Sequence, residues 1–527
     1  MTAASPWRRL LVLVSLPVIL CGACGPSSSA QPKAGNQTLI VDQNFSYDDL
    51  DPALGALTTS IVVDKSVYDT LMTINPHDLS KPYPALATSF TVSPDAKTIT
   101  FQLRHGVKFA SGNPLTSADV VWSLTRLSVV GVRSGQSYPM SGLTATAPDP
   151  YTVVFTSTAP NPAVPITMTV MNTGILDSVL VQQHGGTNNA KDNAEDFLNS
   201  NSAGSGPYVI QSVDRTSQIV LKANPNYWGP KPAYSTVILR NAPPATQALD
   251  VQDGQAQLAL DIPSEAAASI HSSAVNVISG PSSDQLYLIM NASPSVLPWA
   301  GDQNFRDAVR YGLDYQGLVA LAGKGAMQMT GFIPAGLLGS LPAADAPHRD
   351  VTRAQGALAK VGAANPTITL EYATDSSLDG LTFAPFATKI QSDLKEVGIT
   401  VNLQGEPHAI SDARFAAGKI QVYLAFNNAD YPDVADFTNF DLVVPGGDAE
   451  SDHWVQGMDP AIDALTAAAL GATQAADRGA AYQALERAMN DKAYFDFILQ
   501  PGRNLIGAKS VHATVNPFTY VDLGSVT

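Results

Sequence analysis

The stretch that decides the fold runs from Thr367-Ile-Thr-Leu-Glu-Tyr372 to Val422-Tyr-Leu-Ala-Phe426. Both ends are short, largely apolar runs of the kind that form buried strands, and Ile399-Thr-Val-Asn-Leu403 is a third such run between them. Helical patterns over Phe383–Val397 and Ile410–Ala417 separate the three runs. Strands that alternate with helices indicate βαβ units, so this segment predicts an open, mostly parallel sheet.

Further strands and helices are predicted on both sides of this segment. Thr98-Ile-Thr-Phe-Gln-Leu-Arg104 alternates apolar with polar residues, as a half-buried strand does. A helix starts near Ser117, where Thr116 or Ser117 can cap it and Asp119 suits the positive end of its dipole. Further strands are predicted over 38–42, 208–213, 218–222, 236–239 and 284–291, and further helices over 60–74, 305–321 and 460–492. We therefore expect at least two α/β lobes, with a ligand cleft where the strands end.

Composition limits the possible functions. The 527 residues are 45% hydrophobic and 14% charged, which is ordinary for a globular protein that is long enough to build more than one core. The net charge is −16, and the lysines and arginines are scattered rather than gathered in a basic patch. Binding to nucleic acid requires such a patch to displace counterions from the phosphates, so we exclude nucleic acid as a partner.

The N-terminus has the layout of a secretory signal. Two arginines precede the apolar run Leu10–Leu20, which is shorter than the roughly 20 residues that a membrane-spanning helix needs. Both cysteines of the chain, Cys21 and Cys24, follow this run among small residues. A cut before Cys24 resembles processing at a bacterial lipobox, and a cut before Cys21 is the alternative. We predict a signal peptide at 1–23, a lipid on Cys24, a flexible tether at 24–36, and a body anchored to the outer face of the cell membrane.

Motifs of catalysis are missing from the sequence. It contains no G-x-S-x-G, G-x-x-x-x-G-K-[S/T] or H-E-x-x-H pattern. Ser392-Asp-Leu-Lys395 matches S-x-x-K, but the chain has no K-T-G partner and the match lies on a predicted surface helix. The eight histidines are far apart in sequence, and none pair at i, i+4, so we expect no metal site assembled locally. We predict no catalytic residue, no metal, no cofactor and no enzyme activity.

Several long segments, in order along the chain, carry a resemblance to one family. They are Tyr68–Leu71 with Pro84–Leu124, then Gly204–Gly229, then Asn304–Asp314, then Ile390–Val401 with Asn428–Asp433. Together they resemble the extracellular solute-binding proteins of ABC importers, of the peptide/nickel type, over roughly residues 38–520. Ser111 and Tyr315 stand where the family commonly has other residues, which indicates a divergent member.

The resemblance implies a fold. We expect a two-lobed periplasmic-binding-protein-like α/β fold of type II, cluster C-like, with an extra subdomain in the first lobe. The implied boundaries are 37–80, 204–288 and 498–527 for the core of lobe I, 81–203 for its extra subdomain, and 289–497 for lobe II. The chain would cross between the lobes near Tyr287–Asn291 and again near Arg503.

Asp430 is the main candidate for contact with the ligand. It follows the predicted strand Val422–Phe426, and residues at the carboxyl end of such a strand face the cleft. In peptide-binding relatives, the aspartate of the corresponding Ala-Asp-Tyr segment pairs with the α-ammonium of the ligand. The structural alternative is that Asp430 only caps the loop that contains Pro432. Weaker candidates are Asn428, Tyr431 and Phe437.

The resemblance also implies a function. A monomeric receptor would capture a short peptide between its lobes and deliver it to a membrane permease that is driven by ATPase subunits. The alternative is a different small solute on the same fold, such as a nickel chelate, haem, an oligosaccharide or an opine-like compound. Hypotheses of another class are a secreted hydrolase, and an adhesin or signalling receptor that no longer takes part in transport.

Overall fold

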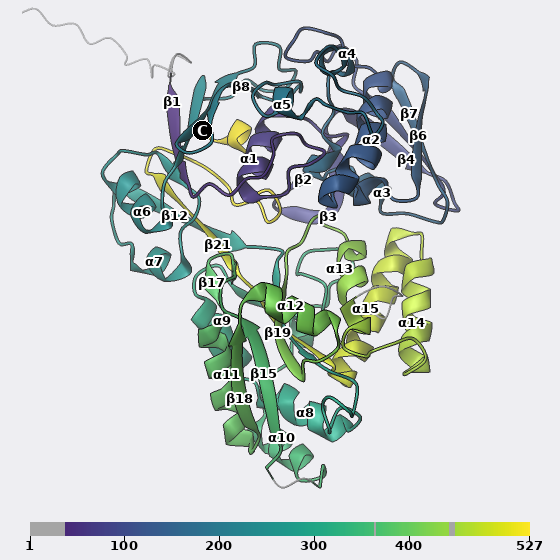
Figure 1. Ribbon diagram of the computed structural model, residues 1–527, viewed down its shortest axis with the longest axis vertical. Helices are drawn as coiled ribbons and strands as arrows, with labels where there is room; N and C mark the ends of the chain where they lie inside the picture. The colour runs from purple at the N-terminus through teal and green to yellow at the C-terminus, as the bar shows by residue number, and fades with distance from the viewer. Residues whose placement is uncertain (1–36, 363–364, 442–447) are drawn as a thin grey trace, which may run out of the picture. The chain divides into compact units, whose positions relative to one another are not determined.

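Strands β15 (Thr367–Ala373), β18 (Thr400–Glu406) and β19 (Val422–Asn427) lie side by side and parallel, with β15 in the middle (Figure 1). Helix α11 (Ala384–Val397) connects β15 to β18, and α12 (His408–Ala416) connects β18 to β19. Each strand carries apolar residues on the faces that the helices cover. The structure, a computed structural model, therefore confirms the predicted βαβ arrangement.

The structure describes residues 37–362, 365–441 and 448–527. The predicted signal peptide, the tether and Cys24 lie outside these ranges. Within them, no helix has both the length and the apolar character that crossing a membrane requires.

Strand β13 (Gln285–Met290) belongs to a six-stranded sheet, and all six of its residues are buried. Leu286, Leu288 and Met290 pack in a core under α8 (Gln303–Gly312) and α11, and Tyr287 and Ile289 pack in a core that includes α15 (Ala475–Lys492). A strand that is covered on both faces is largely apolar, which explains the unbroken apolar run over 286–290. The strand order is β14 (Met327–Gln328), β20 (Phe495–Gln500), β13, β19, β15, β18. We call this sheet and its helices lobe II.

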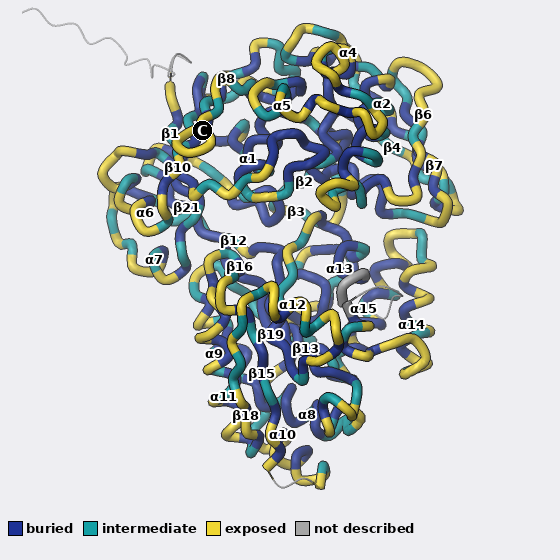
Figure 2. The backbone as a smooth tube through the Cα atoms, viewed as in Figure 1, coloured by how far each residue is buried: buried dark blue, intermediate teal, exposed yellow. Residues whose placement is uncertain are grey.

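A second sheet has seven strands and its own core, and we call it and the elements packed on it lobe I. Its order is β12 (Val275–Pro281), β21 (Gly502–Ala508), β11 (Leu258–Ala259), β1 (Thr38–Gln43), β10 (Thr236–Asn241), β9 (Gln218–Ala223), β8 (Tyr208–Asp214). Strand β1 is parallel to both of its neighbours. Helix α1 (Thr58–Val67) packs its valines into the core of this sheet. Figure 2 shows the buried residues gathered along the strands of both lobes.

A four-stranded antiparallel sheet forms a further layer of lobe I. Its order is β4 (Ala87–Val92), β5 (Thr98–Leu103), β7 (Thr152–Ser157), β6 (Leu143–Asp149). Alternate residues of β5 are buried in a core that includes helix α2 (Ser117–Val130), as the sequence pattern predicts. Thr116 is the N-cap of α2, and its backbone N–H donates to the Asp119 carboxylate at 2.9 Å.

The chain passes between the two large sheets at two adjacent points. Residues 282–284 join β12 to β13, and Pro501 joins β20 to β21. The first crossing therefore precedes the predicted range 287–291, most of which lies in β13 of lobe II. The second crossing lies two residues before Arg503, close to its predicted position. Because β12 pairs with β21 and β13 pairs with β20, the two connections run next to each other.

The predicted helix over 60–74 is wrong in its second half. Helix α1 ends at Val67, and Met72–Asn75 forms strand β2, which pairs with β3 (Asp78–Pro84) in a hairpin. Apolar spacing in a short segment does not distinguish helix from strand, and here pairing with a neighbouring strand decides the structure.

Two other predicted helices are each divided in two. The segment 305–321 forms α8 and α9 (Tyr315–Ala322), because the Asp314 carboxylate accepts the backbone N–H of Gly317 at 3.0 Å and caps a new helix. The segment 460–492 forms α14 (Pro460–Gly471) and α15, with residues 472–474 between them. A capping side chain inside an apolar pattern therefore marks a helix boundary that the periodicity alone does not show.

Glu486 gives lobe II a predictable dependence on pH. Its side chain is fully buried in α15, one oxygen accepts the Ile333 N–H at 2.8 Å, and burial raises its pKa from 4.5 to about 8. The folded state therefore binds a proton that the unfolded state releases, and this contribution to stability is lost as the pH rises from about 4.5 through about 8. We expect Glu486→Gln to flatten the fall in unfolding free energy over this range by up to about 1.4 kcal/mol per pH unit. Urea unfolding at several pH values measures this, and parallel slopes for both proteins would contradict it.

Candidate functional site

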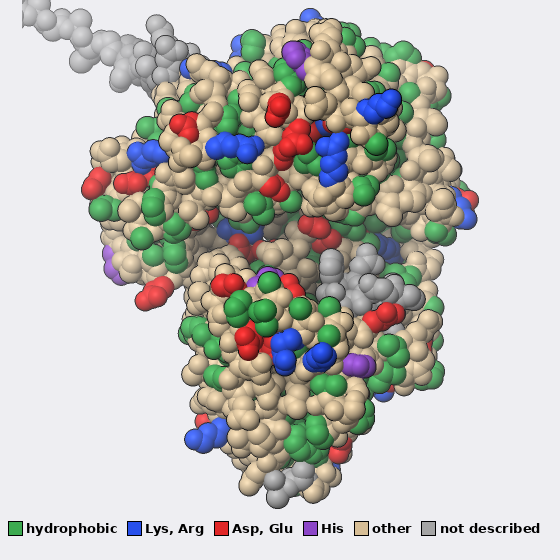
Figure 3. Space-filling model, in the orientation of Figure 1, with side chains coloured by type: hydrophobic (Ala, Val, Ile, Leu, Met, Phe, Trp, Pro, Cys, Tyr) green, Lys and Arg blue, Asp and Glu red, His purple; other side chains and the backbone are tan. Residues whose placement is uncertain are grey.

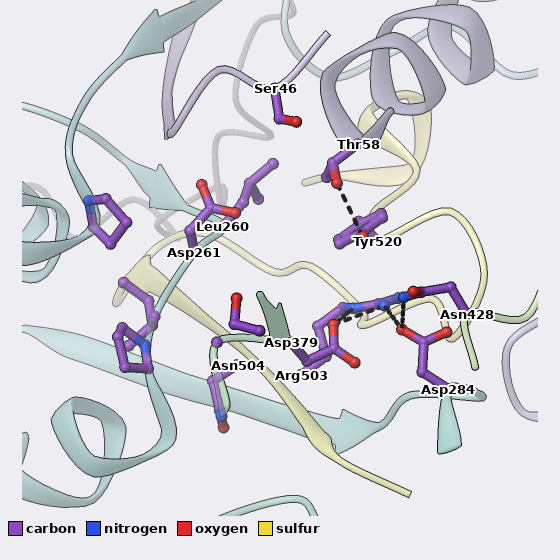
Figure 4. A pocket seen from close by; sticks show the side chains of 15 residues that line it. Ser46, Thr58, Leu260, Asp261, Asp284, Asp379, Asn428, Arg503, Asn504 and Tyr520 are labelled. Atoms are coloured by element: carbon purple, nitrogen blue, oxygen red, sulfur yellow. Dashed lines mark hydrogen bonds and ion pairs between the residues drawn. The ribbon is translucent and has the colours of Figure 1, made fainter. Parts of the chain in front are cut away.

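A cavity of about 370 Å³ lies where strands of both lobes end (Figure 4). On the lobe I side, Ser46 follows β1 and Leu260 follows β11. On the lobe II side, Asn428 follows β19, and Asp379 lies six residues beyond the end of β15. The carboxyl ends of parallel strands are the usual place for ligands in α/β sheets, so the position of this cavity favours binding. Figure 3 shows the surface hollowed between the two lobes, with acidic side chains along the hollow.

Arg503 lies at the base of this cavity, which we call the larger cavity to distinguish it from the smaller one beside Asp430, and it joins the lobes. It projects from β21 of lobe I, and its Nη2 lies 2.9 Å from the Asp379 carboxylate and 3.4 Å from that of Asp284, which directly precedes β13 of lobe II. The same guanidinium donates to the carbonyls of Asn516 and Pro517 at 3.1 and 3.0 Å. Its side chain is 4% exposed, so its charge is committed to acceptors of the protein itself.

The carboxylates around Arg503 outnumber it. Burial, and then the charge of Asp379, raise the pKa of Asp284 to about 7 although Arg503 lowers it. Burial also raises the pKa of Asp261, whose carboxylate accepts the Asn44 N–H and lines the wall opposite. With Asp261, Asp284, Asp379 and one guanidinium, the wall of the cavity is formally anionic.

Asp430 lies in a second, smaller cavity of about 80 Å³. Its side chain keeps contact with solvent because this cavity opens beside it, but protein surrounds it on the other sides, and this burial raises its pKa to about 6. Its backbone N–H donates to the buried Asp436 carboxylate at 2.8 Å. The neighbouring cation, Arg478, is held by Asp433 at 2.7 and 2.5 Å. Among the described residues, none forms an ion pair with Asp430, so its charge is free to meet a ligand.

The other predicted contact residues lie in different surroundings. Asn428 lines the larger cavity and donates to the Asp284 carboxylate at 3.1 Å. Tyr431 is 9% exposed and stacks on Tyr138 of lobe I with ring centroids 6.1 Å apart. Phe437 is fully buried in the core of lobe II, so its ring has no surface to offer a ligand in this conformation.

Sequence reasoning missed Arg503, Asp284, Asp379 and Asp261 as cavity residues. Asp284 precedes its strand rather than following it, but β13 runs antiparallel to β19, so the start of one strand lies beside the end of the other. The pairing of Gln285 with Asn427 brings Asp284 next to Asn428. Of the residues that line the two cavities, only those that follow β19 were predicted from the sequence.

The described residues show no cluster that would hold a metal. No group of three or more His, Cys, Asp or Glu that could hold a metal ion occurs among them. Ser392 and Lys395, which match S-x-x-K, are exposed on α11, as expected of a solvated helix face.

Known proteins share this architecture. The chain is 28% identical over 512 residues to the "Probable D,D-dipeptide-binding periplasmic protein DdpA" of Escherichia coli (strain K12), covering 91% of this chain and 95% of that protein. Two solved structures share the fold. DppA from Helicobacter pylori in complex with the peptide STSA has a TM-score of 0.70 at 21% identity, covering 92% of this chain and 98% of that one. NikA from Brucella suis in complex with Fe(III)-EDTA has a TM-score of 0.77 at 19% identity, covering 93% and 100%.

These likenesses place the two lobes in the type II periplasmic-binding-protein fold, in agreement with the predicted fold class. The model of the family described as "Bacterial extracellular solute-binding proteins, family 5 Middle" matches residues 81–444. This range includes the four-stranded sheet of lobe I, the first crossing and the Asp430 loop. The chain therefore belongs to the family 5 bacterial extracellular solute-binding proteins.

Proposed function

We propose that the chain captures short peptides for an ABC importer, holding the peptide α-ammonium at Asp430. The observation that carries the proposal is a carboxylate in an interlobe cavity that has no cationic partner among the described residues. A carboxylate that protein largely surrounds gains most from a cation that brings its own charge and several N–H donors, and an α-ammonium meets both requirements.

The geometry supports binding between the lobes. Asp430 and Pro432 of lobe II line the smaller cavity together with Tyr138, Val170 and other residues of lobe I. A ligand held there contacts both lobes at once and favours the closed arrangement over an open one. In this proposal the receptor then delivers the peptide to permease and ATPase subunits on other chains.

The remaining features of the proposal come from the sequence. The chain would be exported by its signal peptide, carry a lipid on Cys24, and act as a monomer at the outer face of the cell membrane. Its lobe boundaries would be those that the resemblance implies, with the two crossings moved to 282–284 and 501. It would bind its ligand without changing it, and the relatives that it resembles are named as binding proteins.

Blocking the α-ammonium of a peptide tests the proposal. We expect trialanine to bind, and N-acetyl-trialanine to bind at least about 30-fold more weakly, because acetylation removes the charge that Asp430 meets. Isothermal titration calorimetry with the purified protein measures both affinities.

The matched control is trialanine amide, which changes the other end of the same peptide. Of the described residues that line the two cavities, Arg503 is the one Lys or Arg, and its guanidinium is already bound. Amidation should therefore cost less than acetylation. Equal affinities for all three peptides would refute the role of Asp430, and turnover of trialanine would indicate a hydrolase.

One observation favours a second candidate, a non-peptide solute that is held in the larger cavity. NikA shares this fold and was solved with Fe(III)-EDTA, so the fold itself does not require a peptide. The larger cavity has room for a small solute of this size class, since binding sites usually occupy at least about 300 Å³. Failure of every peptide to bind would support this candidate.

A further inference from the structure

The two cavities adjoin each other along three separate segments of the chain. In each segment one residue lines the smaller cavity and a near neighbour lines the larger cavity. The residues of the smaller cavity are Ala56, Thr519 and Asp430, and their neighbours in the larger cavity are Thr58, Tyr520 and Asn428. In each pair the two residues are at most two positions apart, and two residues of extended chain span about 7 Å. A peptide that is held at Asp430 therefore reaches the larger cavity with its next residue or two.

The larger cavity has unbalanced negative charge. Its wall contains three carboxylates, those of Asp261, Asp284 and Asp379, and the guanidinium of Arg503. Arg503 is bound on all sides, because it contacts Asp284 and Asp379, the hydroxyl of Ser282, two backbone carbonyls and the ring of Tyr520. Asp284 and Asp379 therefore share one cation, and no described lysine or arginine forms an ion pair with Asp261.

Two buried polar atoms beside these cavities have no hydrogen-bond partner among the residues that the structure describes. One is Oδ2 of Asp379, whose side chain is 5% exposed and whose other oxygen accepts from Arg503 at 3.0 Å. The other is Oγ1 of Thr519, a residue that is 7% exposed and lines the smaller cavity. Buried polar groups in folded proteins are almost always paired, so an unpaired one at a cavity wall indicates a partner that arrives with the ligand.

We infer that the larger cavity is a second cation subsite, and that the preferred ligands are short peptides with a lysine or arginine side chain. The inference rests on the proposed function. The α-ammonium meets Asp430, and the side-chain cation enters the larger cavity between Asp261 and Asp379. Figure 4 shows these two carboxylates on opposite sides of the space, with Ser46 at its rim. Such a ligand supplies charge and N–H donors at both ends.

The protonation of the cavity supports this choice of ligand. Burial raises the pKa of Asp284 to about 7, with the charge of Asp379 adding to the rise, and burial also raises the pKa of Asp261. A cation that enters the cavity stabilises the charged carboxylates and lowers both pKa values. Binding of a basic peptide near pH 7 should therefore release protons, whereas binding of a neutral peptide should release fewer.

Paired peptides test the inference. We expect Ala-Lys-Ala or Ala-Ala-Lys to bind at least about tenfold more tightly than the same peptide with norleucine in place of lysine, and the glutamate peptide to bind most weakly. The advantage of lysine should shrink at high salt. Titration calorimetry in two buffers of different ionisation enthalpy measures affinity and proton release together.

Two variants and one control variant assign the effect to the cavity. Ser46 is exposed at the rim, and its hydroxyl forms no hydrogen bond with another described residue. Ser46→Lys therefore places a cation in the cavity and should bring the lysine-to-norleucine ratio to about one. Thr91→Lys, on the exposed face of β4, adds the same charge elsewhere and should keep the ratio of the wild-type protein. Asp261→Asn removes one carboxylate and should lower the ratio, which tests the cavity a second time without adding bulk.

The outcomes separate this inference from the proposed function. Equal binding of the lysine and norleucine peptides to the wild-type protein would overturn the second subsite and leave peptide capture at Asp430 standing. A ratio that survives Ser46→Lys would place the cation elsewhere and would also overturn it. If none of the peptides binds, the proposed function itself fails.

Discussion

Asp430→Asn is expected to weaken the binding of trialanine by about 2–5 kcal/mol, roughly 30- to 5,000-fold. The substitution keeps the shape of the side chain and removes the charge that we assign to the ligand α-ammonium. It leaves the local fold with its main contact, because the backbone N–H of Asp430, not its carboxylate, donates to Asp436 at 2.8 Å. Calorimetric titration of both proteins with the same peptide measures the loss.

The pH dependence of binding gives a second measurement of the same residue. Burial raises the pKa of Asp430 to about 6, so the free protein takes up a proton there as the pH falls through this value. A protonated carboxyl cannot pair with an ammonium, and the affinity of the wild-type protein should therefore fall below about pH 6. The Asp430→Asn protein should not show this fall.

A matched substitution and a second ligand serve as controls for the Asp430→Asn prediction. Asp253→Asn removes an exposed carboxylate at the end of helix α6 (Pro244–Gln252), lines neither cavity and should leave the affinity unchanged. N-acetyl-trialanine should bind to Asp430→Asn and to the wild-type protein with similar affinity, since the ammonium is already gone. If Asp430→Asn weakens both peptides equally, the residue acts on the loop and not on the ligand charge.

Arg126→Met is expected to lower the stability of lobe I by about 3–5 kcal/mol or more, which is a large part of the net stability of a typical domain. The guanidinium of Arg126 on α2 is completely buried, and it lies 2.5 Å from the Asp51 carboxylate and 2.8 Å from that of Asp192. Both acids are also almost inaccessible to solvent. Methionine fills a similar volume but leaves two buried carboxylates without their cation.

Urea unfolding followed by circular dichroism measures this effect as a fall in the transition midpoint. The control is Arg133→Met, seven residues further along, whose pairing with Glu195 spans 3.7 Å between side chains that are 44% and 50% exposed. Exposed pairs of this kind contribute at most about 1 kcal/mol. Similar midpoints for the two variants would show that the buried triad does not stabilise lobe I. Replacing Asp51 and Asp192 by asparagine in the Arg126→Met protein should recover part of the loss.

The sequence was sufficient to predict the strands that form the sheets, but it was a poor guide to where individual helices end. Periodicity in β5 and the apolar runs of β13, β15 and β19 report burial on one or two faces, which any correct fold must provide. The breaks at Val67 and Asp314 depend instead on a hairpin partner and on one capping hydrogen bond. Such contacts are local in space but are not encoded in the apolar spacing, so the predicted helices ran past them.

For the candidate site as well, the sequence determined one part and the tertiary structure the rest. The sequence by itself determined that parallel strands end in a cleft and that Asp430 follows one of them, because strand direction and side-chain order are fixed along the chain. Only the tertiary structure decided that Asp284, Asp379 and Arg503 meet beside it, since they come from the start of an antiparallel strand, a loop beyond β15 and a strand of the other lobe. Their contacts join residues more than one hundred positions apart, and the pairing of strands across the chain sets such contacts.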